Sequence, residues 1–348
     1  MSRACILGCA GTSLTPDERD FFRDARPWGF ILFARNVESS DQTRALTDQL
    51  REAIDDPGAL IFVDQEGGRV QRLKPPVALR RRPAEQFGAL YERDPQAARE
   101  AVRLNHQLLA HELLSVGLDA DCAPCIDIRY PRTHAIIGDR AFGSDPRIVS
   151  ELGRAAVDGL LAGGVAPVIK HIPGHGRAMA DSHLELPVVD TPLEELDRTD
   201  FAPFRALRDA GMAMTAHVVY SAVDAECLTL SRSAIDRVIR GAIGFDGLLM
   251  SDDLSMNALG GSFAERTRRS IEAGCDVVLH GNGALVGEPA RDLRGEFEAI
   301  IEVAPELTGR AAERAAAARR LSRRAEAFDP AAAEARLADL GLEGRAAA

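Results

Sequence analysis

The sequence predicts a single (β/α)8 barrel of the TIM type, and three observations lead to this prediction. Short apolar runs alternate with helical segments along most of the 348 residues. The runs are continuously apolar, which is typical of parallel strands buried on both faces. Eight such units favour a closed barrel, with a doubly wound open sheet as the alternative. The runs lie at 4–9, 30–33, 60–63, 122–126, 165–169, 213–216, 248–250 and 276–279.

Helix boundaries carry equally regular signals. A capping residue followed by proline predicts a helix start, because the first turn needs no hydrogen bond from the missing N–H of proline. A glycine ahead of an apolar run predicts a helix end. Starts are expected at Thr15-Pro16, Asp94-Pro95, Asp145-Pro146, Thr191-Pro192 and Ser262, and ends at Gly117, Gly163 and Gly211.

The barrel is expected to occupy residues 1–305 as one catalytic domain. After about Pro305 the chain becomes rich in Ala and Arg, which are both strong helix formers. Residues 306–348 are therefore predicted to form a helical extension that packs on the barrel or trails from it. Glu residues interleave with the Arg residues, which favours a solvated face over a basic binding surface.

Composition narrows the class of protein. A formal net charge of −11 argues against a nucleic-acid surface or a basic membrane patch. No run approaches the ~18 apolar residues of a membrane span, and the N-terminus resembles a first strand more than a signal peptide. Six dispersed cysteines do not form a disulfide framework. We expect a cytoplasmic monomer that binds neither nucleic acid nor membrane.

Polar residues mark one end of several predicted strands. Asp64, the pair Lys170-His171, His217 and Asp252 stand where an apolar run gives way to a loop. The carboxyl ends of barrel strands meet at one rim, where barrel enzymes carry their catalytic residues. Four equivalent positions on different strands therefore predict a functional site. Arg72, eight residues after Asp64, is suited either to binding hydroxyl groups or to a structural ion pair with that aspartate.

The segment 170–183 holds three histidines, a lysine and an aspartate in a loop with glycine and proline. Asp181 and His183 stand two residues apart, so the carboxylate can orient the imidazole for acid/base catalysis near neutral pH. His175 is interpreted as a structural residue of the loop. A zinc site of His171, His175, Asp181 and His183 is the alternative, although the adjacent Lys170 would oppose a bound cation.

Two adjacent carboxylates follow the strand predicted at 248–250. Asp252 and Asp253 cannot both point the same way from a strand end, because successive side chains alternate. One is expected to face the barrel mouth as a nucleophile or general base, and the other to hold the loop in place.

Together these segments resemble the family 3 glycoside hydrolases, in particular the single-domain bacterial β-N-acetylglucosaminidases of peptidoglycan recycling. The shared motifs are D-Q-E-G-G-R-V-Q-R at 64–72, K-H-I-P-G-H-G at 170–176, A-D-S-H at 180–183 and S-D-D-L-S-M at 251–256. The resemblance runs from about Gly8 to Asn282. It departs at Cys122 and Cys125, where the family has larger apolar residues, and at His280-Gly-Asn-Gly.

The resemblance implies a retaining β-N-acetylhexosaminidase that works without a metal or other cofactor. Asp252 matches the nucleophile that forms a covalent glycosyl-enzyme, His183 the general acid/base and Asp181 its orienting partner. The implied substrates are small carbohydrates: GlcNAc-1,6-anhydroMurNAc, its peptides, or an aryl β-GlcNAc. The positions that match sugar-binding residues are Asp64, Arg72, Arg140, Lys170 and His171.

Three other functions remain open at this stage. A phosphorylase of the same family would use the same residues and deliver phosphate in the second step. A sugar sensor on a barrel scaffold would need neither a nucleophile nor a proton shuttle, and a zinc hydrolase would lose activity with a chelator. If His183 is not the shuttle, the remaining candidates are Glu66, Asp139 and Asp253.

Overall fold

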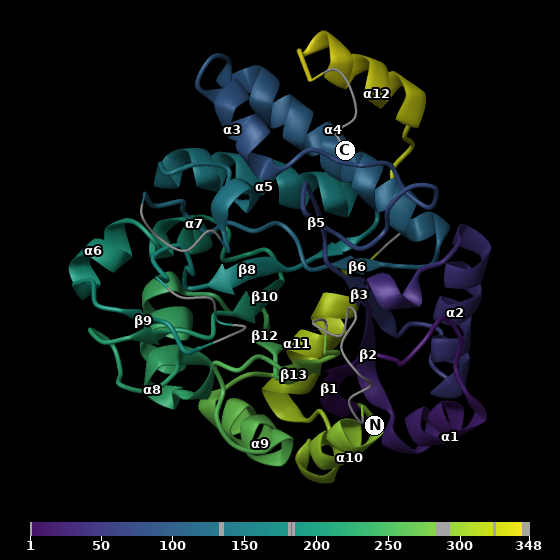
Figure 1. The fold of residues 1–348 in the computed structure, drawn as a ribbon. Coiled ribbons are helices and arrows are strands. Elements are labelled where there is room, and N and C mark those ends of the chain that lie inside the picture. The colour runs from purple at the N-terminus through teal and green to yellow at the C-terminus, as the bar shows by residue number, and fades with distance from the viewer. Residues whose placement is uncertain are drawn as a thin grey trace.

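The computed structural model describes residues 2–131, 136–179, 182, 185–282, 293–322 and 325–342. Its main sheet has nine parallel strands in the order β7-β6-β3-β2-β1-β13-β12-β10-β8, and helices surround it (Figure 1). The strands are β1 (Arg3–Leu7), β2 (Pro27–Leu32), β3 (Leu60–Val63), β6 (Ala120–Asp121), β7 (Ala166–Pro167), β8 (Ile169–Ile172), β10 (Met212–Thr215), β12 (Leu248–Asp253) and β13 (Val277–His280).

The predicted barrel is confirmed, with differences in its fourth and fifth units. The fourth strand, expected at 122–126, is β6 at Ala120–Asp121, and within 122–126 only Cys125 forms an isolated bridge, to Lys170. The strand expected at 165–169 divides at Val168 into β7, which pairs with β6, and β8, which pairs with β10. Consecutive β7 and β8 stand at the two ends of the strand order, so the sheet curls into a nearly closed barrel. This division accounts for nine strands where the sequence predicts eight.

A ring of helices covers the outside of the barrel (Figure 1). Two of them, α4 and α5, lie side by side along much of their length. The helices are α1 (Pro16–Ala25), α2 (Ser40–Ala53), α3 (Ala84–Tyr91), α4 (Pro95–Ser115), α5 (Pro146–Ala162), α6 (Leu193–Arg198), α7 (Phe201–Ala206), α8 (Arg232–Ala234) with its continuation Ile235–Ile243, α9 (Phe263–Ala273) and α10 (Leu293–Val303).

Most of the predicted helix starts are confirmed. Thr15 and Ser262 form capping boxes at α1 and α9, and Asp94 and Asp145 accept hydrogen bonds from the first turns of α4 and α5. The start at Thr191 is wrong: α6 begins at Leu193, and no side chain caps it. Without that cap, the chain remains extended for one residue longer than predicted.

The predicted helix ends need one correction. Gly117 and Gly211 adopt φ angles of 79° and 89°, which residues with a Cβ rarely adopt. At the end of α5, however, Gly163 keeps a helical φ of −75°, and Gly164 adopts the φ of 87° that turns the chain. The sequence pattern marked the right turn but not the residue with the left-handed conformation.

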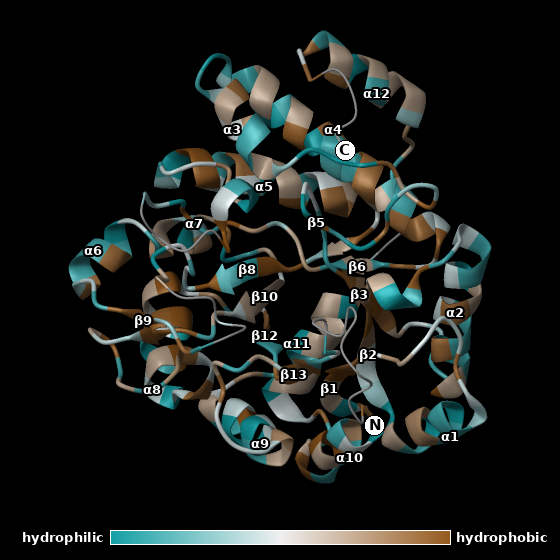
Figure 2. Ribbon diagram, viewed as in Figure 1, coloured by the Kyte–Doolittle hydropathy of each residue, from teal (hydrophilic) through white to brown (hydrophobic). Residues whose placement is uncertain are grey.

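The interior of the barrel is apolar, and the C-terminal part of the chain helps to enclose it. Figure 2 shows hydrophobic residues concentrated in the strands and a mixture of hydrophilic and hydrophobic residues along the surrounding helices. Ala315 and Ala318 of α11 (Gly309–Arg319) are buried in one cluster with Trp28 and other residues at the amino-terminal end of the barrel. Helix α12 (Pro330–Asp339) packs against α4. Among the helices of the described ranges, none has the length and apolar character that crossing a membrane requires.

Arg314 connects α11 to the barrel strands. Its Nε and Nη2 contact the backbone oxygen and Oδ1 of Asp246 at 3.0 and 2.6 Å, and its Nη1 contacts Asp276 Oδ1 at 3.1 Å. Asp276 is buried next to β13, where its other oxygen accepts hydrogen bonds from Arg240 and from the N–H of Leu249. Arg314 therefore links α11 to both β12 and β13.

We expect Arg314→Ala to lower the free energy of unfolding by about 2 kcal/mol, because the buried Asp276 carboxylate loses one of its ion-pair partners. Thermal or urea unfolding followed by circular dichroism measures the change. Arg310→Ala is the matched control: Arg310 also contacts Asp246, but its side chain is 59% exposed, where an ion pair contributes only ~0–1 kcal/mol. Equal effects of the two substitutions would contradict the role of Arg314.

Candidate active site

A cavity of about 360 Å³ opens at the carboxyl ends of the barrel strands. Its wall is built by the end of β3, the hairpin of β4 (Gln65–Gly67) and β5 (Val70–Gln71), the turn Gly138–Arg140, β8 and β12. The predicted dyad residues Asp181 and His183 lie outside the described residues. The wall includes the predicted nucleophile and all the predicted sugar-binding residues: Asp64, Arg72, Arg140, Lys170, His171 and Asp252.

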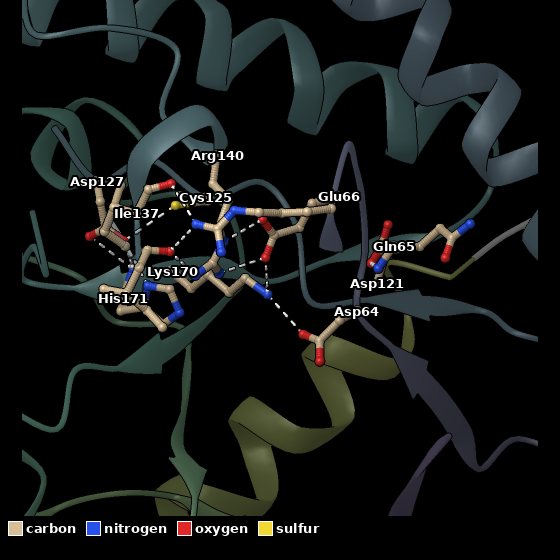
Figure 3. Close-up of polar contacts among 12 residues, drawn as sticks. Asp64, Gln65, Glu66, Asp121, Cys125, Asp127, Ile137, Arg140, Lys170 and His171 are labelled. Carbon is tan, nitrogen blue, oxygen red and sulfur yellow. Dashed lines mark hydrogen bonds and ion pairs between the residues drawn. The ribbon is translucent and has the colours of Figure 1, made fainter. Parts of the chain in front are cut away.

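Lys170 lies at the centre of this wall, although its side chain is buried. Its ammonium contacts Asp64 Oδ1 at 2.8 Å and Glu66 Oε1 at 2.7 Å, as Figure 3 shows. Burial alone would lower the pKa of Lys170, but the two carboxylates raise it above its usual value. The lysine therefore stays charged, as a buried ammonium can when it is paired.

Two arginines extend this arrangement. Arg72 Nη2 contacts Asp64 Oδ2 at 3.0 Å, and Arg140 binds Glu66 through Nε and Nη2 at 2.8 and 2.7 Å. Burial would raise the pKa of both acids, but the cations lower that of Glu66 to about 2 and that of Asp64 well below its usual range. Charges thus alternate along Arg72, Asp64, Lys170, Glu66 and Arg140, which we call the charge row.

His171 is oriented by a residue behind the cavity wall. Its Nδ1 lies 2.6 Å from Asp127 Oδ2, and Asp127 also accepts hydrogen bonds from the backbone N–H groups of His171 and His175 (Figure 3). Asp127 is buried, which would raise its pKa, but His171 and these hydrogen bonds hold the pKa well below its usual value. The carboxylate is therefore ionised.

The two carboxylates at the end of β12 have different surroundings. Asp252 accepts a hydrogen bond from the N–H of Asp253 at 2.7 Å, and no cation of the described ranges forms an ion pair with it. Asp253 accepts hydrogen bonds from the N–H groups of Ser255 and Gly281, and its Oδ1 lies 3.3 Å from His280 Nδ1. Despite burial, these contacts lower the pKa of Asp253 to about 2. Asp252 remains available to a ligand, whereas Asp253 connects β12 to β13.

Two further histidines lie near the cavity without lining it. His217 is buried, with Nδ1 2.8 Å from Thr229 Oγ1 and Nε2 3.3 Å from the backbone oxygen of Asp253. His217 thus follows the carboxyl end of β10, as predicted, but its ring contacts Thr229 and the end of β12 and does not line the cavity. His175 Nε2 lies 3.1 Å from Ser182 Oγ, and burial lowers the pKa of His175 to about 4. These contacts agree with a structural role for His175.

Two further acids contribute to the site, Glu66 and Asp127, and the sequence predicted neither of these roles. Glu66 lies two residues after Asp64, and residues i and i+2 of extended chain face the same side, so its approach to Lys170 could have been foreseen. Asp127 ends the apolar run 122–126, which is the same signal that marked Asp64. Its partner could not be foreseen, because the contact to His171 spans 44 positions.

The described residues contain one group of potential metal ligands, Cys125, Asp127 and His171, whose ligand atoms lie within 4.8 Å of one another. The 2.6 Å between Asp127 and His171 is a hydrogen-bond distance. Two ligands of a tetrahedral zinc at ~2.0 Å would lie about 3.3 Å apart. The arrangement therefore supports a hydrogen-bonded pair more than a metal centre.

The fold and the site together define a barrel enzyme of the glycosidase class. Residues 15–323 match the model of the glycosyl hydrolase family 3 N-terminal domain. The chain belongs to this family, as its motifs predict.

Relatives and solved structures agree with this assignment. The chain is 41% identical over 278 residues to the β-hexosaminidase of Thiobacillus denitrificans, covering 79% of this chain and 77% of that protein. It superimposes on NagZ from Neisseria gonorrhoeae in complex with N-trifluoroacetyl-D-glucosamine with a TM-score of 0.78 and 33% identity, covering 97% and 98% of the two chains.

A third similar structure is a family 3 β-N-acetylglucosaminidase from Paenibacillus, with a TM-score of 0.80 and 30% identity. The match covers 93% of this chain but only 63% of that protein. The prediction of a family 3 glycoside hydrolase of the β-N-acetylhexosaminidase type is confirmed by these comparisons.

Asp121 is another buried aspartate close to the site, and unlike Asp127 it accepts few hydrogen bonds. Asp121 Oδ1 accepts a hydrogen bond from the N–H of Gln65, whereas its buried Oδ2 has no hydrogen-bond partner among the described residues. Burial raises the pKa of Asp121 well above its usual value. The folded protein therefore binds a proton at Asp121 that the unfolded chain releases at lower pH, and stability falls as the pH rises above about 4.

We expect Asp121→Asn to raise the free energy of unfolding by about 1–3 kcal/mol at pH 7, because the amide carries no charge to desolvate. The gain should fade as the pH approaches 4, where the unfolded aspartate of the parent protein also becomes protonated. Urea unfolding of both proteins at several pH values measures the difference. A gain that stays constant with pH would contradict the assignment of the raised pKa.

Proposed function

We propose that this chain is a retaining exo-β-N-acetylglucosaminidase that releases GlcNAc from β-1,4-linked peptidoglycan fragments, GlcNAc-1,6-anhydroMurNAc and its peptides. The observation that carries the proposal is a contrast within one cavity wall. Asp64 and Glu66 are paired in the charge row, whereas Asp252 accepts a single backbone hydrogen bond. One wall thus offers paired donors for sugar hydroxyls and one carboxylate suited to attack.

In the proposed reaction, Asp252 attacks the anomeric carbon and forms a covalent glycosyl-enzyme. His183 gives a proton to the leaving oxygen and then takes one from the water that releases the sugar. Asp181 orients the imidazole and favours its charged form. Tryptophan stacking plays no part in this scheme, because Trp28, the one tryptophan, is buried at the other end of the barrel.

Hydrolysis is favoured over phosphorolysis by the pairing of the cations in the described wall. A phosphate dianion entering beside Asp252 would meet cations that already have carboxylate partners, and a neutral water has no need of a free cation. The pairs are Arg69 with Asp139, Arg72 and Lys170 with Asp64, and Arg140 with Glu66. A non-catalytic sugar sensor gives no reason for an unpaired carboxylate at this position.

We further propose that the enzyme acts as a monomer in the cytoplasm, without a cofactor. All six cysteines are free and buried, which is typical of a reducing compartment. Cell fractionation tests the proposed location, and analytical ultracentrifugation tests the oligomeric state.

The first test of the function compares aryl β-glycosides that differ only at position 2. We expect kcat/KM for the 2-acetamido substrate to exceed that for the glucoside by at least about 10²-fold. A site built to hydrogen-bond a substituent leaves buried groups unpaired when the substituent is missing. Rates are measured with and without phosphate. Rates within threefold of one another, or a sugar phosphate as product, would contradict the proposal.

The second test identifies the nucleophile. A 5-fluoro-GlcNAc donor should leave a stable adduct on the peptide that contains Asp252, as located by mass spectrometry after proteolysis. Asp252→Asn should lose at least about 10³-fold in kcat while its unfolding transition stays unchanged. Asp253→Asn is the neighbouring comparison and should lose stability, because Asp253 connects two strands. An adduct on Asp253 would reverse the two assignments.

The third test concerns His183. An activated aryl leaving group barely needs protonation, whereas a sugar leaving group does, so His183→Ala should impair disaccharide cleavage far more than aryl cleavage. With the aryl substrate, release of the intermediate should become limiting, and added azide should accelerate turnover and give a β-glycosyl azide. Asp181→Asn should show a milder form of this pattern. If all leaving groups slow equally and azide has no effect, the shuttle is another residue.

A further inference from the structure

Asp127 is placed to determine which nitrogen of His171 carries a proton. Its carboxylate is buried and accepts four hydrogen bonds. The donors are His171 Nδ1 at 2.6 Å, the N–H of His171 at 3.3 Å, the N–H of His175 at 2.6 Å and the Cys125 thiol at 3.3 Å (Figure 3). An ionised carboxylate can only accept, so Nδ1 must be the protonated nitrogen.

This constraint affects the chemistry that His171 presents to the cavity. With Nδ1 protonated and bound to Asp127, the neutral ring has its lone pair on Nε2, which becomes an acceptor. Lysine and arginine side chains are hydrogen-bond donors only. Lys170, Arg72 and Arg140 therefore cannot accept a hydrogen bond from a sugar hydroxyl. Besides the carboxylates of the wall, His171 Nε2 is the kind of acceptor that such a hydroxyl needs.

The same carboxylate also holds the start of the loop after β8. The N–H of His175 binds Asp127 Oδ1, the N–H of Gly174 binds the backbone oxygen of His171 at 2.7 Å, and Tyr220 Oη donates to the backbone oxygen of Gly174 at 2.5 Å. Gly176 packs so closely that a Cβ there would lie 1.8 Å from the backbone oxygen of Ile128. The loop thus starts from a fixed base beside Asp127.

We propose that Asp127 is a positioning residue of this enzyme: it fixes the Nδ1–H tautomer of His171, so that Nε2 accepts a hydrogen bond from a hydroxyl of the bound sugar. The proposal rests on the proposed glycosidase function for its ligand. Asp127 itself does not line the cavity, and it acts through the ring of His171.

The substitution that tests the proposal is Asp127→Asn, which keeps the size of the side chain and adds a donor. The new amide can donate to His171 Nδ1, which moves the ring proton to Nε2 and replaces the acceptor in the cavity by another donor. We expect kcat/KM to fall by roughly 10- to 100-fold, because a buried hydroxyl that loses its acceptor costs about 1–3 kcal/mol.

Spectroscopy separates positioning from a merely structural role. In ¹⁵N-edited NMR spectra recorded across pH, neutral His171 of the parent protein should carry its proton on Nδ1, and that of the Asp127→Asn variant on Nε2. The resonance is assigned by its absence in His171→Gln. Because the parent spectrum alone is informative, the test survives even if the variant does not fold. An Nε2–H ring, or a ring protonated on both nitrogens at all accessible pH values, would overturn the proposal.

The binding of sugar analogues provides a second measure of which nitrogen of His171 carries the proton. Two analogues of GlcNAc replace the hydroxyl that faces His171, one by hydrogen and one by fluorine. Each should bind the parent about 10-fold more weakly than GlcNAc, because neither can donate a hydrogen bond to Nε2. In Asp127→Asn the penalty for fluorine should shrink below about twofold, since Nε2–H needs only an acceptor. Unchanged penalties in the variant would contradict the tautomer exchange.

Asp121→Asn is the matched control, since it makes the same chemical change at a buried aspartate of the same segment that contacts no histidine in the described structure. It should keep kcat/KM within about twofold of the parent. The outcomes also separate the two proposals. If the parent neither binds nor hydrolyses β-GlcNAc, the proposed function fails. If the parent is active and Asp127→Asn keeps both its kinetics and its tautomer, only this inference fails.

Discussion

One constraint governs the site: a lysine buried at the mouth of a barrel must remain charged. The side chain of Lys170 is 2% exposed, so its ammonium requires the carboxylates of Asp64 and Glu66, and these in turn pair with Arg72 and Arg140. The members of the charge row come from three separate segments of the chain, 64–72, Arg140 and Lys170, and the row forms only when these segments meet in the folded barrel. The site therefore depends on how the fold brings these three segments together.

In the proposed function, the charge row separates sugar binding from the chemical step. Its donors are held in place before a ligand arrives, so the hydroxyls of the proposed substrate would meet groups that need little reorganisation. Asp64 and Glu66 are committed to this task, because each carboxylate has two cationic partners. Asp252 stands outside the row on β12 and keeps the oxygen that a nucleophile needs. The apolar barrel interior below, covered by α11, supplies a rigid floor for both tasks.

The sequence predicted more of the fold than of the contacts. Apolar runs and capping residues located the strands and most helix starts, because both depend on local chemistry. The division of the fifth strand at Val168 left no mark in the hydropathy pattern, since the predicted run 165–169 is continuously apolar across it. Strand ends located Asp64, Lys170 and Asp252. The same rule placed His217 at a strand end but could not give the direction of its side chain, which contacts Thr229 and does not line the cavity.

Polar residues at the ends of apolar runs do not all have the same role, as three aspartates of one segment show. Asp119, Asp121 and Asp127 all border apolar stretches, and burial would raise the pKa of each. At Asp119 and Asp121 burial outweighs their donors, whereas at Asp127 the imidazole of His171 and several N–H groups reverse the direction. The donors directed at each carboxylate thus decide whether burial raises its pKa or is outweighed. Those donors come from elements far away in the chain, so only the folded arrangement distinguishes the three.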